Sequence, residues 1–378
     1  MNSAISHFID NTWSPPAVGQ TLAADDAQLV LCYAAKAILQ QPDIYDRVQA
    51  RYPNAAIALC STAGEIYQDM VFDDTLVATA MAFSHTRLAT ASVNISAFET
   101  SYDAAEQLAR TLAADDLVYI MILSDGNLVN GSELVKGFKA GAGNVLVTGG
   151  LAGDGANFKS TLVGLNGPPE EGMIVAIGFY GNRLVVTHGS KGGWDGFGVE
   201  KTITRSDRNV LYEIEGENAL EMYKKYLGPD AEHLPGSALL FPLSVTIPGI
   251  DRPIVRTILS IDEAAHSMTF AGDVPEGSTV RFMKADFDKL TAAAAMAAGQ
   301  TIGNREQKPD LAILVSCVGR KLIYGPRIDA EIEAVCDTLG SNVPIAGFYS
   351  YGEISPFGEG GSCHLHNQTM TITAFYEL

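Results

Sequence analysis

Two arginines and three polar residues in the C-terminal third of the sequence are of the types that bind a small zwitterion. Arg320 and Arg327 follow one apolar run, and Tyr349, Tyr351 and Glu353 follow the next. A guanidinium binds a carboxylate, an acid binds an ammonium group, and tyrosines can complete the polar wall. Because the ends of neighbouring strands in α/β sheets often meet at a ligand, this spacing predicts an amino-acid-like pocket. An ordinary ion pair between Arg320 and Glu353 is the structural alternative.

A second candidate is the Cys60-Ser61-Thr62 segment. Cys60 or Ser61 could act as a nucleophile if a histidine folded beside it, but no sequence feature supplies that base. The sequence also contains neither a G-x-S-x-G nucleophile elbow nor a G-x-x-x-x-G-K-[ST] phosphate loop. We therefore expect a protein that is not an enzyme, and a hydrolase acting through Cys60 or Ser61 is the weakest alternative.

A short pattern recurs three times in the chain: an uncharged residue, a glycine and an acid. It occurs within Cys60–Ile66, Gly149–Asp154 and Tyr349–Ile354. Glycine permits an unusual φ at a turn, and the acid can accept hydrogen bonds from free backbone N–H groups beyond it. A structural turn is therefore at least as good an interpretation as a binding site. The turn residues in question are Ser61, Thr62, Gly64, Glu65, Gly153 and Asp154.

The elements that must position these residues follow a repeated order. Apolar, strand-like runs open three units, at Leu29–Tyr33, Leu117–Leu123 and Leu311–Ser316. Each is followed by a helix-like stretch and then by further strand-like runs, which gives a β-α-β-β-β rhythm. The glycine and acid come directly after the second strand of each unit. Short meanders with helices between them favour an α+β fold of layered mixed or antiparallel sheets with helices on the outer faces.

The length of 378 residues suits two domains. The glycine-rich segment 189–198 is the best linker, which predicts an N-terminal domain over 1–190 and a C-terminal domain over 199–378. A set of antiparallel strands is expected between the second and third units. One helix over 219–226 precedes most of these strands, and an alanine-rich helix over 288–298 closes the set.

Composition limits the classes of partner. The net charge is −19, from 44 acidic and 25 basic residues, which disfavours nucleic acids and anionic membranes. The apolar runs are too short to span a membrane, and the N-terminus lacks the pattern of a secretion signal, so we expect a cytoplasmic protein. The 5 cysteines show no C-x-x-C spacing, which predicts reduced thiols without a zinc site or a disulfide framework.

Taken together, these segments resemble the FIST family. Cys60–Ile66 is similar to the signature of its N-terminal module, and Tyr351–Ile354 with Leu365–Thr369 is similar to that of its C-terminal module. Gly149–Gly155 and Ser316–Arg320 are further matching stretches. The similarity spans nearly the whole chain, and the order and spacing of the segments are more specific than any one of them.

The resemblance implies a FIST N-type domain followed by a FIST C-type domain, both serving as sensory input. Members of the family are proposed to bind small ligands such as amino acids, and are often linked to histidine kinases or cyclic-di-nucleotide enzymes. The resemblance also adds Cys317 to the predicted ligand-binding residues. Because no output domain is fused to this chain, we expect a stand-alone sensor that regulates a partner histidine kinase or another signalling protein.

A free-standing subset of the family, the NosP proteins, implies a second possibility, which is haem binding and nitric oxide sensing. Haem needs an axial donor, usually a histidine. His366 matches the family's motif and is the predicted metal ligand, and His364 would point to the same face of the strand. The alternative is a structural hydrogen bond from His366 to Glu353 or to a backbone carbonyl. The glycine-rich segment 356–362 could serve as a lid.

Overall fold

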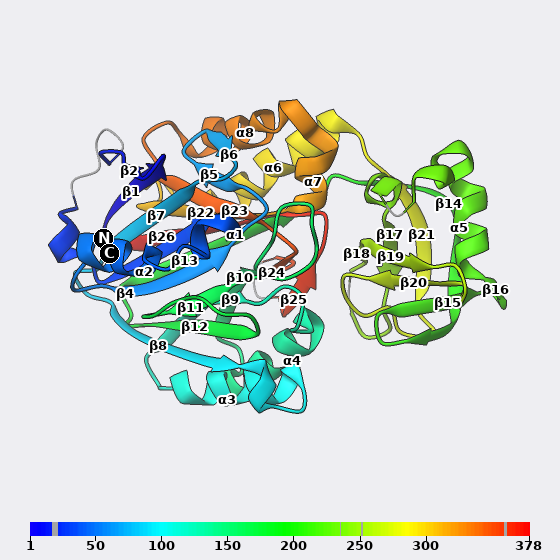
Figure 1. The fold of residues 1–378 in the computed structure, drawn as a ribbon, viewed down its shortest axis with the longest axis horizontal. Helices are drawn as coiled ribbons and strands as arrows, with labels where there is room; N and C mark the ends of the chain where they lie inside the picture. Colours follow the sequence, from blue (N-terminus) through cyan, green and yellow to red (C-terminus); the bar gives the residue numbers. More distant parts are fainter. Residues whose placement is uncertain (17–21, 235, 251, 359–360) are drawn as a thin grey trace.

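A large and a small body make up the protein. The computed structural model describes residues 1–16, 22–234, 236–250, 252–358 and 361–378. Three six-stranded sheets form the large body, and a fourth sheet forms the small one (Figure 1). The two chain ends lie together on the large body, where the amino group of Met1 pairs with Glu377 at 3.2 Å. The predicted α+β class with layered mixed and antiparallel sheets is confirmed.

The three sheets of the large body have the following strand orders. The first sheet is β11 (Val163–Leu165), β4 (Ala56–Ser61), β3 (Leu29–Ala34), β7 (Leu76–Ala82), β1 (Asn2–Ile9) and β2 (Thr12–Trp13). The second is β25 (Cys363–His366), β24 (Gly352–Pro356), β10 (Leu146–Leu151), β9 (Leu117–Ser124), β12 (Met173–Tyr180) and β8 (Arg87–Asn94). The third is β13 (Leu184–Lys191), β26 (Met370–Glu377), β22 (Leu311–Cys317), β23 (Ile345–Ser350), β5 (Glu65–Tyr67) and β6 (Met70–Phe72).

Each of these sheets is built around the same three-stranded unit. The unit consists of a parallel pair of strands and a third strand that runs antiparallel to the first strand of the pair. These strands are β3, β4 and β7 in the first unit, β9, β10 and β12 in the second, and β22, β23 and β26 in the third. The repeated β-α-β-β-β order predicted from the sequence is therefore present three times. A parallel pair requires a crossover connection, and the helices after the first strand of each unit provide it.

The three units exchange strands in a cycle. The first unit gives β5 and β6 to the third sheet, where β5 pairs with β23. The third unit gives β24 and β25 to the second sheet, where β24 pairs with β10. The second unit gives β11 to the first sheet, where it pairs with β4. Strand β5 begins at Glu65 and β24 begins at Gly352, so the first and third turns lie where the units interlock.

Strand alternation places one core between the sheets and others beneath the helices. Leu29, Leu31 and Tyr33 of β3 face the core shared by all three sheets, whereas Val30 and Cys32 face α2 (Ile44–Arg51). Both faces of these strands are buried, which is why they read as continuous apolar runs. Burying one large aliphatic or aromatic side chain stabilises the fold by about 1.5–3 kcal/mol.

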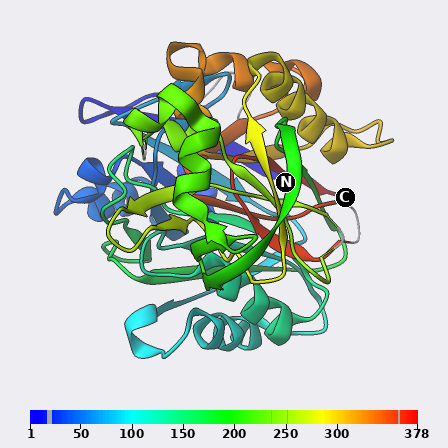
Figure 2. The same ribbon diagram turned by 90° about the vertical axis from the view of Figure 1, so that its right-hand side faces the viewer.

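Helices cover the outer faces of the sheets. The short helix α1 (Lys36–Leu39) and α2 pack on the first sheet, and α3 (Ser101–Leu112) and α4 (Gly131–Ala142) pack on the second. The third sheet is covered by α6 (Phe287–Ile302), α7 (Val318–Tyr324) and α8 (Asp329–Leu339). Figure 2 shows α3 and α4 at one end of the molecule and α6, α7 and α8 at the other. The start of α4 is capped by Asn130, whose side chain accepts hydrogen bonds from the amides of Ser132 and Glu133.

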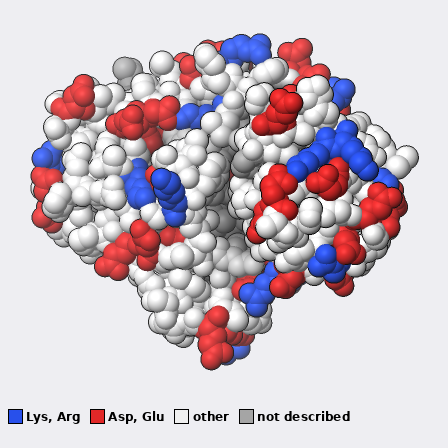
Figure 3. Space-filling model, turned by 45° about the vertical axis from the view of Figure 1, so that its right-hand side comes forward, with Lys and Arg blue, Asp and Glu red and all other residues white. Residues whose placement is uncertain are grey.

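The small body is the segment between β13 and α6. Its sheet has the order β18 (Ile254–Arg256), β17 (Leu243–Thr246), β21 (Thr279–Lys284), β14 (Asp195–Asp207), β15 (Val210–Ile214), β20 (Ser267–Phe270) and β19 (Ile258–Asp262), with β16 (Glu217–Asn218) beside β15. Helix α5 (Ala219–Leu227) packs on this sheet. The surface is hollowed between the two bodies on the face seen in Figure 3.

The two bodies do not coincide with the domains 1–190 and 199–378. Residues on both sides of the predicted linker 189–198 share the second and third sheets of the large body, and only the segment from β14 to β21 forms the small one. The linker lies at the first crossing between the bodies, because β13 ends at Lys191 and β14 begins at Asp195. Within the described ranges, no helix is long and apolar enough to cross a membrane.

Candidate functional site

The three glycine and acid turns meet at one junction. The first and third turns are joined by two backbone hydrogen bonds, from Ala63 N to Tyr349 O and from Tyr349 N to Gly64 O, each 2.8 Å long. The first and second are joined by Gly153 N, which donates to Ser61 O at 2.9 Å, and by the Ser61 hydroxyl, which donates to Gly153 O at 2.8 Å. The tertiary structure thus brings together segments that are about three hundred residues apart in the chain.

Glu65 is a buried acid at this junction. Its Oε2 accepts hydrogen bonds from the amide of Thr75 at 3.1 Å and from the Thr75 hydroxyl at 2.8 Å, and its Oε1 accepts from the Thr62 hydroxyl. Burial raises the pKa of Glu65 to about 7, although the hydrogen bonds from the two threonines oppose that shift. Glu65 therefore has the predicted role of accepting a hydrogen bond from a free backbone N–H group, that of Thr75.

Glu353 repeats the same arrangement in the third turn. Its Oε2 accepts from the amide of Thr369 at 3.1 Å and from the Thr369 hydroxyl at 2.7 Å, and its Oε1 accepts from the Ser350 hydroxyl at 2.9 Å. Its side chain is fully buried, and burial raises its pKa to about 8. Thr62 and Ser350 each precede their acid by three residues, so the two turns are equivalent in sequence and in bonding.

The second turn is built differently. Asp154 accepts from the Lys36 ammonium group at 3.4 Å and from the Asn157 side chain at 3.3 Å, at the edge of the junction. The acid that holds free amides in this unit is the fully buried Asp125, which accepts from Asn127 N at 2.7 Å and from Gly172 N at 3.0 Å. The sequence analysis missed Asp125. The signal that could have found it is the Asp-Gly pair directly after the strand β9.

The glycines of the turns serve two purposes. Gly64 has a φ of +140°, so the predicted need for an unusual φ is confirmed there. For Gly153 and Gly352 that prediction is wrong, because neither is among the positive-φ glycines of the described chain. Close packing is the reason for glycine at these two positions: a Cβ would lie 2.8 Å from Ala63 N at the first and 2.9 Å from a Leu365 methyl group at the second.

Arg320 is fully buried, and it pairs with Glu331. Its Nε donates to Glu331 Oε1 at 2.5 Å, its Nη1 to Gly192 O at 2.5 Å, and its Nη2 to Leu290 O at 3.0 Å. The predicted alternative of an ion pair between Arg320 and Glu353 is therefore wrong. The partner of Arg320 is instead Glu331 on α8, eleven residues after Arg320 in the chain.

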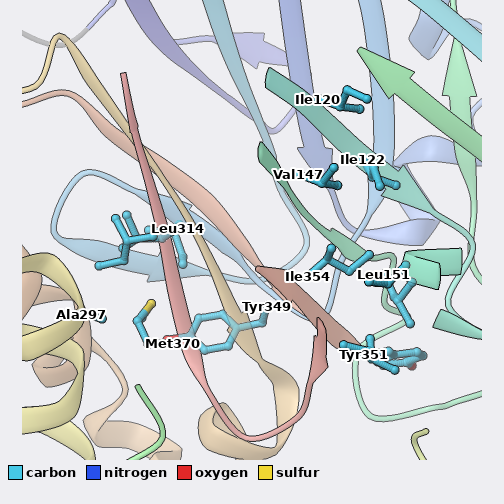
Figure 4. Packing of buried hydrophobic residues seen from close by; sticks show 14 of the residues in the cluster. Ile120, Ile122, Val147, Leu151, Ala297, Leu314, Tyr349, Tyr351, Ile354 and Met370 are labelled. Atoms are coloured by element: carbon cyan, nitrogen blue, oxygen red, sulfur yellow. The ribbon is translucent and has the colours of Figure 1, made fainter. Parts of the chain in front are cut away.

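The remaining members of the predicted pocket are placed apart. The Tyr349 hydroxyl donates to Glu331 at 3.0 Å and so joins the Arg320 network. The Tyr351 hydroxyl accepts from Phe158 N at 3.0 Å, and its ring stacks on that phenylalanine. Figure 4 shows Tyr349 on the side of Met370 and Tyr351 on the opposite side, below Leu151. The structure thus connects Tyr349 with Arg320, and Tyr351 with the loop after β10.

Arg327 and Cys317 complete the predicted set. Arg327 is exposed, and its guanidinium lies 4.1 Å from the ring centre of Phe287. Cys317 is buried beside the third turn, and its amide donates to Thr369 O at 3.1 Å. Burial raises the pKa of the Cys317 thiol, with a further contribution from Glu353. Arg327 therefore lies outside the buried network, and Cys317 lies inside the core.

His366 is buried in β25, and it bonds to a backbone carbonyl. Because that Ser355 oxygen can only accept, the His366 Nε2 carries the hydrogen of the 2.8 Å bond. The ring also packs edge-on against Phe357, and burial lowers its pKa to about 3. As placed, His366 does not fit the role of an axial haem ligand, since its ring is enclosed and this nitrogen is bonded. In the described part of the chain, no group of three or more His, Cys, Asp and Glu could hold a metal ion.

The candidate nucleophiles are also enclosed. The Ser61 hydroxyl donates to Gly153 O and accepts from Leu162 N, both at 2.8 Å, and its side chain is fully buried. Cys60 is fully buried as well, and burial raises the pKa of its thiol. A raised pKa keeps this thiol protonated and therefore a poor nucleophile.

A large cleft lies beside β25 and is not lined by the residues of the three turns. It has a volume of about 1190 Å³ and is lined by α4, the start of β10, β13, the end of α6 and the segment around Phe357, with Arg252 from the small body. Phe357 contacts His366, with the two ring centres 4.6 Å apart, and it also lines the cleft, whereas His366 does not. The predicted lid contributes Pro356, Phe357 and Ser362 to the wall, and its residues 359–360 lie outside the described ranges. Sequence reasoning missed this cleft, since its lining residues are dispersed and carry no motif.

Comparisons with known proteins agree with the repeated signatures. The FIST N domain matches residues 28–217, and the FIST C domain matches residues 219–356. An uncharacterized protein of Mycobacterium tuberculosis is 25% identical over 215 residues, which cover 54% of this chain and 55% of that protein. An uncharacterized protein of Mycobacterium bovis is 28% identical over 196 residues, which cover 48% of each chain. The chain thus spans about half the length of these curated relatives.

A solved structure described as cyanuic acid hydrolase from A. caulinodans covers 94% of this chain, and this chain covers 91% of that one. The sequence identity is 6% and the TM-score is 0.36, a likeness on which no functional argument rests. The two domain matches together extend over most of the chain, in the order that the sequence signatures indicated. The chain therefore belongs to the FIST family, with a FIST N domain followed by a FIST C domain.

Proposed function

We propose that this protein is a sensor that binds a small molecule in the cleft between α4, α6 and the small body, and reports its occupancy to a partner signalling protein such as a histidine kinase. FIST domains are associated with signal-transduction sensing. The observation that carries the proposal is the cleft itself, whose volume of about 1190 Å³ is slightly larger than the roughly 300–1,000 Å³ of typical small-molecule sites and so leaves room for such a ligand. The predicted residues Arg320, Tyr349 and Glu353 are not among the described residues that line this cleft.

A physical connection between the cleft and the small body supports a signalling role. Arg256 of β18 is buried, and its Nη1 donates to Leu365 O of β25 at 3.1 Å. Cys363, on the same strand β25, lines the cleft, as does Arg252 of the small body. A ligand that contacts both would favour one position of the small body, because it would bind that position more tightly than others.

We further propose that the chain acts by binding and not by catalysis. The burial of Cys60 and Ser61, and the use of the Ser61 hydroxyl in two backbone hydrogen bonds, support this proposal. The haem alternative remains a prediction of the family resemblance, and the environment of His366 does not support it.

The test is a thermal-shift screen of a broad metabolite library, followed by calorimetry on the compounds that stabilise the protein. A ligand at a concentration of 100 Kd should add about 2.7 kcal/mol to the free energy of unfolding. Asn144, which is exposed and lines the cleft, would be replaced by Trp to fill it, and the exposed Asn182 in the turn before β13 supplies the matched control. We expect Asn144→Trp to abolish binding and Asn182→Trp to leave it unchanged. Equal binding by both variants would place the ligand elsewhere and refute the assignment.

A further inference from the structure

The cleft is positively charged in a strongly acidic protein. Its lining includes the cationic side chains of Lys139, Arg252 and Arg305, and among the described lining residues there is no Asp or Glu. In the whole chain, acids outnumber bases by 44 to 25. Asp251 and Glu359 lie outside the described residues. A cluster of cations is therefore the reverse of what the composition would place on an arbitrary surface.

These three cations are not used in ion pairs. Within the ranges that the structure describes, no carboxylate lies within 4.0 Å of the charged group of Lys139, Arg252 or Arg305. The Arg305 guanidinium lies 5.5 Å from the ring centre of Tyr376. Lys139 stands in the last turn of α4, where a cation also complements the helix dipole. Arg252 and Arg305 are therefore the cations of the cleft that are most available to a ligand.

Two histidines near the cleft have lowered pKa values, mainly because their rings are buried. Burial lowers the pKa of His364, and the nearby charges of Arg256 and Lys139 lower it further. Burial likewise lowers the pKa of His366, and Arg256 contributes to that shift. Cations disfavour a further positive charge on an imidazole, and for the same reason they favour an anion.

The floor between the cations is apolar. Val135, Val145, Val147 and Val186 come from α4, the segment before β10, β10 and β13, and Phe357 adds an aromatic wall. The neutral polar side chains of Asn144, Gln300 and Asn304 also line the cleft. A ligand with a charged end and an apolar body would satisfy both kinds of surface.

From this arrangement we propose that the ligand is an organic anion, a carboxylate or a phosphate ester with an apolar body, whose charge is bound by Arg252 of the small body and by Arg305 in the segment that follows α6. The inference rests on the proposed function, since it names the ligand class of the same cleft. A net-negative ligand differs from the zwitterion expected from the sequence, because the described lining supplies cations for a carboxylate and no acid for an ammonium group. Arg252 also makes the binding of charge depend on the position of the small body.

The experiment compares ligands of matched shape and different charge by calorimetry on the full chain: 3-phenylpropionate and phenyl phosphate as anions, 3-phenylpropionamide as the neutral compound, and 3-phenylpropylamine as the cation. We expect the anions to bind and the amide and amine to bind at least tenfold more weakly. Arg252→Gln and Arg305→Gln should each weaken anion binding roughly tenfold, since a charge-assisted hydrogen bond is lost. Lys225→Gln, which removes an exposed cation of α5 outside the cleft, is the control for net charge and should bind like the parent protein.

Each alternative result decides between the two proposals. Amide or amine binding as tight as anion binding, blocked by Asn144→Trp, would overturn the ligand class and leave the sensory cleft in place. Anion binding that Arg252→Gln and Arg305→Gln do not weaken would overturn the assignment of these residues. If no probe binds while a neutral compound of the metabolite library does, the ligand class alone is overturned. Failure of every compound would overturn the sensory cleft as well.

Discussion

Glu65 and Glu353 occupy equivalent positions in two interlocked turns, and each accepts hydrogen bonds from both the amide and the hydroxyl of one threonine further along the chain. Thr75 and Thr369 lie near the starts of the third strands of their units, β7 and β26. Each acid thus ties its turn to the strand that completes its own unit. The second unit uses Asp125 for a related purpose, so the three-fold repetition extends from strand order to hydrogen bonding.

The raised pKa values of these acids predict a pH-dependent stability. A carboxyl whose pKa is about 8 in the folded protein and about 4.5 otherwise is protonated in the native state while ionised in the unfolded state between these values. The native state then binds more protons, so the free energy of unfolding falls as the pH rises from about 4.5 to about 8. Urea denaturation at a series of pH values between pH 5 and pH 9 measures this change in the free energy of unfolding.

The variant Glu353→Gln separates this contribution from that of Glu65. Its amide stays neutral at every pH, so the remaining decrease in unfolding free energy comes from Glu65 and should level off above the Glu65 pKa of about 7, at a lower pH than in the parent protein. An unchanged slope between pH 7 and pH 8 would contradict the assignment. Glu353→Ala should destabilise far more, since three buried donors lose their acceptor at about 1–3 kcal/mol each.

Replacing Arg320 by Met should destabilise the protein by about 3–5 kcal/mol, because Glu331 would remain buried without its counter-ion. The double variant Arg320→Met, Glu331→Gln removes both charges and should recover a large part of that loss. Urea denaturation of the parent protein and the variants gives these free energies. A neutral effect of Arg320→Met, or a double variant no more stable than the single one, would show that the pair does not act as described.

Gly149 and Gly143 form a matched pair for backbone strain. Both have positive φ, +148° and +67°, but a Cβ at Gly149 would lie 1.9 Å from Ile122 O, whereas none of the surveyed atoms lies within 4 Å at Gly143. Gly143 has a ψ of −121°, outside the left-handed α region, so Gly143→Ala should lower the free energy of unfolding by about 1–3 kcal/mol through backbone strain alone. Gly149→Ala should lower the free energy of unfolding by more than about 4 kcal/mol, because the added methyl group would push β10 away from β9. Equal melting temperatures for the two variants would refute the close approach of these strands.

The haem prediction can be tested on His366 and His364 together. If haem added to the purified protein gives a Soret band, His366→Ala should keep that band, because the ring is enclosed and its Nε2 is bonded to Ser355 O. His364→Ala is the matched comparison, since His364 borders the smaller hollow next to the cleft. The measurements are absorption spectra, with circular dichroism to verify folding. A band lost in a folded His366→Ala protein would restore His366 as the ligand.

The repeated architecture could be predicted from the sequence because it depends on local patterns. Leu29–Tyr33 is apolar throughout, and Leu311–Ser316 is apolar up to Val315, because both faces of their strands are buried. The glycine and acid turns could be recognised for a similar reason, as a turn needs specific residue types at adjacent positions. The acceptor role of Glu65 and Glu353 follows from those residue types alone.

The partners of these residues were decided only by the tertiary structure. Arg320 pairs with Glu331 and not with Glu353, because the packing of α8 brings Glu331 within hydrogen-bond distance of the buried guanidinium. The exchange of β5, β11 and β24 between units depends on long-range pairing, which leaves no local pattern. The cleft is formed where α4, α6, β13 and the small body approach one another, so its charge arises from residues that are distant in the chain. The sequence by itself determined the units and their turns, and the packing of units against each other determined which side chains meet.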